Sequence, residues 1–178
     1  DGGTEGLFED ASPAGEAAPG PDGGGPVGAP PVDDPATALA RADRLYAEGS
    51  ITAAVQVYGV VFATGASYEQ AWALYRIAWC AVNLEQLDQA SDRMEQLLRM
   101  LEAPLDDREV RLRRDAVHDL ALFESMRGDV GPAGAVERIE RVLEGEERDA
   151  ALRTLADQYR AAGRLDDEAL VRARLDAR

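Results

Sequence analysis

One histidine and two aspartates are the residues of this chain best suited to acid–base or metal chemistry. His118 is the single histidine among 178 residues. A histidine beside a carboxylate can act as a general base or hold a metal ion. Asp115 lies three residues before it, and Asp157 is the one further carboxylate that we group with it. Apart from Asp115, no ligand stands one helical turn from His118, so we predict a binding or packing role, with no catalytic residue and no metal site.

The single cysteine also argues against enzyme chemistry. Cys80 lies in the apolar stretch 77–82, which is typical of a buried, inert thiol. One cysteine excludes both an internal disulfide and a metal site built from several cysteines. Neighbouring carboxylates such as Asp106 and Asp107 fall at predicted helix N-termini, where the helix dipole favours them. We therefore expect a protein that is not an enzyme and needs no cofactor.

Aromatic residues recur at helical spacing in the middle of the chain. Trp72, Tyr75, Trp79 and Asn83 are separated by three, four and four residues, which places all four on one stripe of a helix. Aromatic side chains with polar tips are common at interfaces. They are also common where neighbouring helices pack, so both interpretations stay open. Asn83 favours the wet surface slightly, because an amide costs less there.

Four arginines follow at the start of a later helix. The run consists of Arg108, Arg111, Arg113 and Arg114. Asp115 stands four residues after Arg111, at ion-pair spacing. The run is either a solvated, partly paired helix face or a patch that binds acidic groups.

Helical periodicity dominates the chain from Asp34 onward. Asp34 is a candidate N-cap with Pro35 at the first helical position. Glycines and prolines then divide the apolar pattern into eight segments. We predict helices over about 35–48, 51–64, 68–83, 87–102, 106–126, 132–143, 147–162 and 165–177. Sustained alternation is missing, so the expected fold class is all-α, with no sheet.

The first 34 residues have a different composition. Residues 1–34 are rich in glycine and proline and carry eight acids and no base. Such a segment buries too little apolar surface to fold, so we predict a disordered acidic tether before one helical domain, 35–178. A docking arm anchored by Leu7 and Phe8 is the alternative.

Charge and hydropathy exclude two classes of partner. The whole chain has a net charge of −15, and residues 35–178 keep 26 acids against 19 arginines. This balance argues against a nucleic-acid partner. No apolar run approaches the ~18–20 residues of a membrane helix, so we expect no transmembrane segment.

Alanines mark an internal repeat. Ala54, Ala90, Ala133 and Ala169 each follow a turn residue and an apolar residue, at spacings of 36, 43 and 36. In the last copy Glu168 occupies the place of the alanine, which comes one residue late. The long spacing implies extra residues near Pro104. Small residues at these positions allow two helices to cross closely.

This pattern resembles the tetratricopeptide repeat (TPR). The last copy matches the family pattern most fully, with Leu152, Leu155-Ala156, Tyr159 and Gly163. The second copy matches in part, with Leu74 and Ile77-Ala78, and so does the third, with Val117 and Leu120-Ala121. Arg41-Ala42 departs from the large–small pair of the family. The resemblance implies an α-solenoid of about four helix–turn–helix repeats, at about 35–67, 68–104, 105–145 and 146–178.

The resemblance also implies a function. In TPR proteins the first helix of each repeat lines a concave groove that binds a peptide or helix of a protein partner. The matching positions here are Asp43, Tyr46, Trp72, Tyr75, Trp79, Asn83, Asp115, His118, Arg153, Asp157 and Arg160. We expect a non-enzymatic scaffold for protein–protein interaction. The alternatives are self-association through the exposed last helix, 165–177, and a small-molecule sensor.

A narrower resemblance concerns the source. LYRIAWCAVNLEQLDQASDRMEQLL, at 74–98, is similar to TPR proteins of myxobacterial cell envelopes, including gliding-motility lipoproteins and periplasmic proteins. All 19 bases are arginine, which fits a GC-rich bacterial genome. This resemblance implies a cell-envelope assembly in the periplasm or at the outer membrane, with the cytoplasm as the alternative. The chain begins at Asp1, so we expect a processed or excised part of a longer protein.

Overall fold

A computed structural model describes residues 34–177 and contains eight helices in that part of the chain. The helices are α1 (Pro35–Ala47), α2 (Ile51–Thr64), α3 (Ser67–Asn83), α4 (Leu87–Met100), α5 (Asp107–Met126), α6 (Pro132–Val142), α7 (Gly145–Ala161) and α8 (Leu165–Asp176). All eight belong to the second of the chain's two units, Asp33–Arg178. The tether predicted over 1–34 lies outside the described residues, apart from Asp34. Elsewhere the all-α class is confirmed, and every helix end falls within two residues of its prediction.

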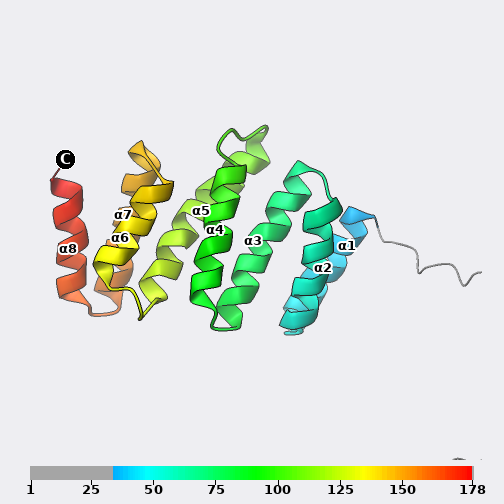
Figure 1. Ribbon diagram of the computed structural model, residues 1–178, viewed down its shortest axis with the longest axis horizontal. Coiled ribbons are helices and arrows are strands. Elements are labelled where there is room, and N and C mark those ends of the chain that lie inside the picture. Colours follow the sequence, from blue (N-terminus) through cyan, green and yellow to red (C-terminus); the bar gives the residue numbers. More distant parts are fainter. Residues whose placement is uncertain (1–33, 178) are drawn as a thin grey trace, which may run out of the picture. The chain divides into compact units, whose positions relative to one another are not determined.

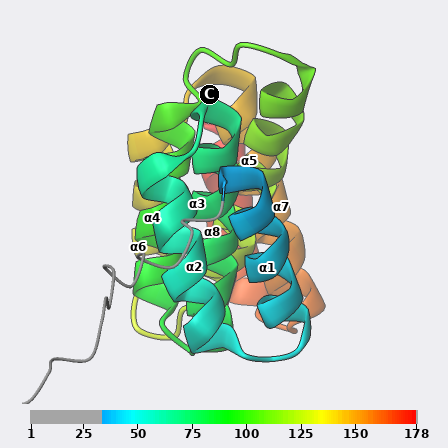
Figure 2. The same ribbon diagram turned by 90° about the vertical axis from the view of Figure 1, so that its right-hand side faces the viewer.

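The helices of the second unit stack in chain order, from α1 to α8 (Figure 1). From α1 to α5, consecutive helices pack against one another, whereas α5 packs mainly against α7 and α7 also packs against α8. Figure 2 shows α1, α5 and α7 on one side of the stack and α2, α4 and α6 on the other. Odd-numbered and even-numbered helices thus form two layers, which is the arrangement of an α-solenoid.

Three of the turns between paired helices share one conformation. Gly49, Glu85 and Gly163 each have a positive φ, of 79°, 58° and 73°. In each turn the amide that follows this residue donates to a carbonyl five residues back, as Gln86 N does to Ala81 O at 2.9 Å. This left-handed cap ends a helix and reverses the chain in three residues. Helices α1–α2, α3–α4 and α7–α8 are therefore repeats of one structural unit.

The small residues of the odd helices pack as the repeat pattern predicts. Ala42, Ala78, Ala121 and Ala156 have no exposed surface. On the even helices Ala54 and Ala90 are also fully buried. The short side chains let the helices of a unit lie close together.

For two alanines the prediction of a buried position at a helix crossing is wrong. Ala133 and Ala169 are exposed, whereas Ala135 is fully buried and Glu168 is 6% exposed. The connection from α5 to α6, 127–131, is two residues longer than the three-residue turns, so the buried position on α6 shifts from Ala133 to Ala135. On α8 the buried position belongs to Glu168 itself.

The long spacing before the third unit has a further origin. The connection 101–106 contains Pro104 and is longer than the two-residue connection 65–66. Helix α5, at 20 residues, also exceeds α3, at 17 residues. The predicted extra residues near Pro104 are confirmed.

In the third unit a buried carboxylate, Glu124, occupies the place that Tyr159 holds in the last unit. Glu124 has no exposed surface and lies 3.5 Å from Arg127 and 3.4 Å from Arg138. Burial raises the pKa of Glu124. Arg138 of α6 also binds Asp92 of α4 at 2.9 Å, and Arg127 binds Asp88 at 3.0 Å. These ion pairs join α6 and its preceding turn to α4 and α5.

Candidate partner-binding surface

The aromatic stripe of α3 lies half-buried between α1 and α5. Trp72 stacks on Tyr68, with ring centroids 6.4 Å apart, and lies at a tilt to Tyr75, with centroids 5.6 Å apart. Trp79 meets Phe123 of α5 edge to face at 5.1 Å. The same rings therefore pack against neighbouring helices and keep one side accessible, so the stripe has features of both a packing surface and an exposed surface.

Asp119 of α5 organises the end of the stripe that faces α5. Its Oδ2 accepts hydrogen bonds from Tyr75 Oη at 2.7 Å and from Trp79 Nε1 at 3.0 Å. Its Oδ1 lies 3.1 Å from His118 Nδ1. Burial and the Asp119 hydrogen bond raise the pKa of Tyr75. The polar tips of Tyr75 and Trp79 are thus occupied within the protein, while Trp72 remains at the edge of a hollow.

A second cluster joins α3 to α1 and α2. Asp43 accepts hydrogen bonds from Tyr58 Oη and from Arg76 Nε, the latter at 3.2 Å. The Arg76 guanidinium lies 4.1 Å from the centre of the Tyr46 ring, a cation–π contact. Asn83 Nδ2 donates to Tyr46 Oη at 3.0 Å and to the Trp79 carbonyl at 2.8 Å. The predicted residues Asp43, Tyr46 and Asn83 therefore hold α1 against α3.

The four arginines of α5 take different roles. Arg113 donates to the Leu98 and Leu101 carbonyls at 2.7 and 3.0 Å, so it caps the C-terminal end of α4. It also binds Glu147 of α7 at 2.6 Å. Arg113 is therefore a structural link between three helices and cannot belong to an acid-binding patch.

The other three arginines lie nearer the surface. Arg108 binds Asp106 at 3.0 Å and lies 4.5 Å above the Tyr68 ring. Asp115 pairs with Arg114, at 3.8 Å, and not with Arg111 as its spacing suggests. Arg111 is exposed and forms no ion pair with another described residue. Of the predicted acid-binding patch, Arg111 and Arg114 thus remain at the surface.

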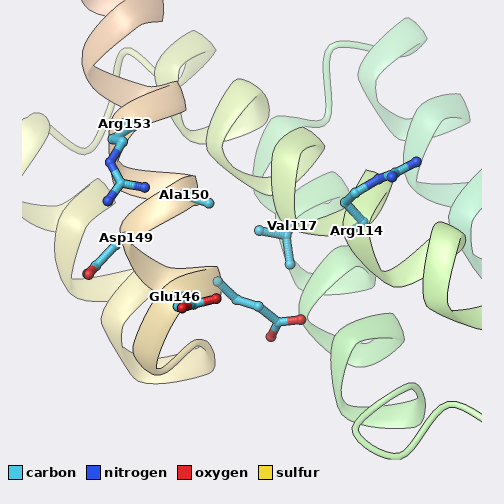
Figure 3. A pocket seen from close by; sticks show the side chains of 7 residues that line it. Arg114, Val117, Glu146, Asp149, Ala150 and Arg153 are labelled. Carbon is cyan, nitrogen blue, oxygen red and sulfur yellow. The ribbon is translucent and has the colours of Figure 1, made fainter.

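Three hollows border the exposed side of α5, α7 and their neighbours. The largest, of about 460 Å³, lies between α5 and α7 and is lined by Arg114, Val117, Glu146, Glu147, Asp149, Ala150 and Arg153 (Figure 3). A hollow of about 440 Å³ between α7 and α8 is lined by Asp149, Arg153, Arg172, Leu175 and Asp176. A third, of about 170 Å³, lies between α3 and α5 and is lined by Tyr68, Trp72, Arg108, Arg111, Leu112 and Asp115.

The three hollows belong to one surface, which we call the odd-helix surface. The two larger hollows share Asp149 and Arg153. On α5, Arg111 and Arg114 stand one helical turn apart, with the smaller hollow on one flank and the largest on the other. The odd-helix surface therefore runs from α3 across α5 and α7 to α8.

The remaining predicted residues lie on or beside this surface. Arg153 borders both larger hollows. Asp157 pairs with Arg172 at 3.0 Å, and Arg160 pairs with Glu168 at 2.5 Å, so these two join α7 to α8. His118 and Asp115 are exposed on α5. His118 and Asp157 are not brought together in any described contact.

Several residues of the surface were missed in the sequence. Tyr68 could have been found, because it precedes Trp72 by one turn on the same stripe. Asp119 follows His118 directly but carries no spacing signal that links it to Tyr75 and Trp79. Glu146 looks like an ordinary acid of a helix N-terminus, and only the packing of α7 against α5 places it in a hollow.

The part of the chain that the structure describes shows neither a cluster of metal ligands nor an exposed thiol. Among residues 34–177, no group of three or more histidine, cysteine or acidic side chains is arranged to hold a metal ion. Cys80 is buried, and its burial raises the pKa of the thiol to about 11, so it is a poor nucleophile. None of the described helices combines the length and the apolar character needed to cross a bilayer.

No family model and no curated protein matches the chain. It is similar to two crystal structures of nearly identical TPR-like repeats from a putative kinesin light chain of Podosopora anserina, one of them carrying a substitution. Each is 18% identical, and the match covers 82% of this chain and 96% of that chain with a TM-score of 0.36. The fold assignment rests on the arrangement of the helices themselves.

Proposed function

We propose that the protein is a non-enzymatic scaffold that binds a peptide or helical segment of a partner protein on the odd-helix surface. The observation that carries this proposal is the row of three hollows, two of them sharing Asp149 and Arg153. A row that crosses α3, α5, α7 and α8 suits an elongated occupant better than a compact small molecule.

The lining of the hollows supports a protein occupant. Tyr68 and Trp72 offer aromatic surface beside Arg108 and Arg111 in the smallest hollow. Aromatic residues and arginine are the residue types that most often carry binding energy in protein interfaces. In the largest hollow, Val117 and Ala150 provide an apolar floor between charged side chains.

A peptide selection tests the proposal, because random sequences sample many kinds of elongated occupant. Random peptides displayed on phage are selected against the wild-type protein, and the affinities of the enriched peptides are measured. The blocking variant is Ala150→Trp, because Ala150 is exposed and lines the largest hollow. We expect this variant to weaken the enriched peptides by about ten-fold or more, equivalent to ~1.4 kcal/mol.

The matched control places the same large side chain elsewhere. Ala133 is also exposed but lies on α6, so Ala133→Trp should leave the affinities unchanged. Failure to enrich any peptide, or an equal loss of affinity in both variants, contradicts binding on the odd-helix surface. Circular dichroism confirms that both variants keep their helices.

We further propose that the scaffold works within a bacterial cell-envelope assembly. The support is the sequence resemblance to myxobacterial envelope proteins and the exclusive use of arginine as the basic residue. Fractionation of the source cells tests it: recovery with periplasm or outer membrane supports the assignment, and recovery with cytoplasm contradicts it.

Self-association is a second candidate, favoured by two exposed leucines on the last described helix. Leu165 is 63% exposed and Leu170 is 42% exposed, both on α8. A helix with apolar residues on both faces is typical of one that is covered on both. Light scattering should then show a dimer or larger species that Leu170→Asp converts to monomer; a monomeric wild-type protein contradicts this candidate.

A further inference from the structure

We propose that the segment bound by the odd-helix surface carries both acidic and basic residues, with carboxylates facing Arg111 and Arg153 and cations facing Glu146 and Asp176. This inference rests on the proposed function and adds the chemistry of the partner. It follows from which charged side chains around the hollows already have partners within the protein.

Most charges that border the hollows are already neutralised. The internal pairs are Arg108–Asp106 at 3.0 Å, Arg113–Glu147 at 2.6 Å, Arg148–Asp149 at 2.7 Å and Arg172–Asp157 at 3.0 Å. Arg114 lies 3.8 Å from Asp115. A group that is satisfied in this way offers little to a ligand, because the existing pair would have to break first.

Four charged side chains around the hollows differ from these. Arg111, Glu146, Arg153 and Asp176 are exposed, and none forms an ion pair or hydrogen bond through its side chain with another residue in the described range 34–177. Two are cations and two are anions. They are therefore the charges that a partner can neutralise.

The four charges are distributed over all three hollows, with both signs represented. Arg111 borders the hollow between α3 and α5. Glu146 and Arg153 both border the hollow between α5 and α7, where they come from the same helix, and Ala150 lies between them in the sequence (Figure 3). Asp176 borders the hollow between α7 and α8, together with Arg153. An occupant of the row of hollows thus meets groups of both signs, and in the hollow between α5 and α7 it meets Glu146 and Arg153 together.

Covering such charges without neutralising them is costly. A charge removed from water without a partner loses its hydration, whereas a charge that finds an opposite partner recovers part of it. A wholly acidic segment would leave Glu146 and Asp176 facing like charges. A wholly basic segment would do the same at Arg111 and Arg153. Only a segment with both signs can neutralise all four.

The long-range field points to the same conclusion. Residues 35–178 carry 26 acids against 19 arginines, so a strongly acidic segment is repelled before it reaches the surface. The local arginines, however, require carboxylates. Basic residues that steer the segment and acidic residues that seat against Arg111 and Arg153 satisfy both conditions. The floor formed by Val117 and Ala150 leaves room for an apolar side chain between them.

The experiment selects peptides against two forms of the protein and reads their charges. A random peptide library on phage is selected against the wild type and, in parallel, against the double variant Arg153→Glu with Glu146→Arg. Because neither side chain has an internal partner among the described residues, the exchange removes no internal ion pair. The control double variant, Arg93→Glu with Glu137→Arg, exchanges exposed charges on α4 and α6.

The expected result has two parts. Peptides enriched on the wild type contain both acids and bases at recurring positions, and they lose about ten-fold or more in affinity for the double variant but not for the control. Peptides enriched on the double variant carry the two signs in exchanged positions.

Two other results overturn the inference while leaving the proposed function intact. One is enrichment of peptides that carry a single sign of charge. The other is enrichment of the same sequences on the wild type and on the double variant. Failure to enrich any peptide on the wild type contradicts the proposed function itself, and the inference with it.

Discussion

Asp119 is the residue on which the aromatic stripe of α3 depends. One carboxylate oxygen accepts from both Tyr75 Oη and Trp79 Nε1, and the residue is 7% exposed. The stripe itself could be read from the spacing of Trp72, Tyr75 and Trp79. Its acceptor could not, because no local rule relates residue 119 to residues 75 and 79, which lie on another helix.

Replacing Asp119 should destabilise the fold. Asp119→Ala leaves two half-buried donors without an acceptor, which we expect to cost about 1–3 kcal/mol of unfolding free energy. Urea unfolding measures the change. Asp115→Ala, at an exposed position with a weak ion pair, is the control and should change stability by less than about 0.5 kcal/mol. Equal effects in the two variants would contradict the role of Asp119.

Glu168 should make the stability of the protein depend on pH. Its Oε1 binds Arg160 Nη2 at 2.5 Å and Arg172 Nε at 2.6 Å, and these hydrogen bonds hold its pKa below the ordinary value of 4.5. A carboxylate whose pKa is lower in the folded state stabilises that state above the ordinary pKa. The contribution is lost as the pH falls through the folded-state pKa.

Glu168→Gln tests this dependence. The variant should be less stable than the wild type at pH 7, and the two should converge as the pH falls below 4.5. Thermal unfolding at a series of pH values provides the measurement. A difference that stays constant down to the acid limit would show that packing, and not charge, accounts for the loss.

Glu85 is strained by its position in the turn between α3 and α4. It adopts a φ of 58°, whereas the equivalent turns have Gly49 and Gly163. Glu85→Gly should therefore raise the free energy of unfolding by roughly 0.5–1 kcal/mol. Glu48 has an ordinary φ of −78° in the α1–α2 turn, so Glu48→Gly should bring no gain. A loss of stability in both variants would contradict the left-handed cap.

At the scale of the elements, helix existence and helix ends followed from local chemistry. Asp34 and Asp106 cap the amides that begin α1 and α5, as their residue type predicts. Gly49 and Gly163 follow the first helix of their units, where the pattern places them. The register of α6 could not be predicted from local chemistry. The residues of its five-residue connection indicate a turn just as those of a three-residue turn do. Only packing distinguishes Ala133 from Ala135.

The α6 register gives a direct mutational test. Ala135→Leu should destabilise the protein by roughly 1–3 kcal/mol through overpacking, as should Ala90→Leu at the equivalent position of α4. Ala133→Leu should cost less than about 0.5 kcal/mol, because Ala133 is exposed. If Ala133→Leu cost more stability than Ala135→Leu, the register predicted from the sequence would be correct after all.

At the scale of the whole molecule, we expect the helical unit to be stable without the N-terminal segment. Residues 1–33 contain no base and little apolar sequence, so they offer little surface for the helices to pack against. Deleting 1–33 while keeping the N-cap Asp34 should leave the melting temperature unchanged. Deleting Asp34 as well should lower stability by about 1 kcal/mol. A melting temperature lower by several degrees after deletion of 1–33 would show that the helical unit depends on this segment for its stability.

The partner-binding assignment belongs to the whole molecule, because three hollows between different helices form the surface. Neither composition nor the repeat pattern could establish which of the predicted residues remain available. Tyr46 and Asn83 are engaged with each other, whereas Arg153 lines two hollows. That division depends on contacts between helices that are distant in sequence, such as α3 with α5.

Amide chemical-shift mapping with an enriched peptide tests partner binding on the odd-helix surface most directly, because it reports on every face of the helical unit at once. We expect the largest shifts on α3, α5, α7 and α8, around Trp72, Arg111, Val117, Ala150 and Arg153. Shifts confined to α2, α4 and α6 would contradict the assignment, since the peptide would then occupy the even-helix layer.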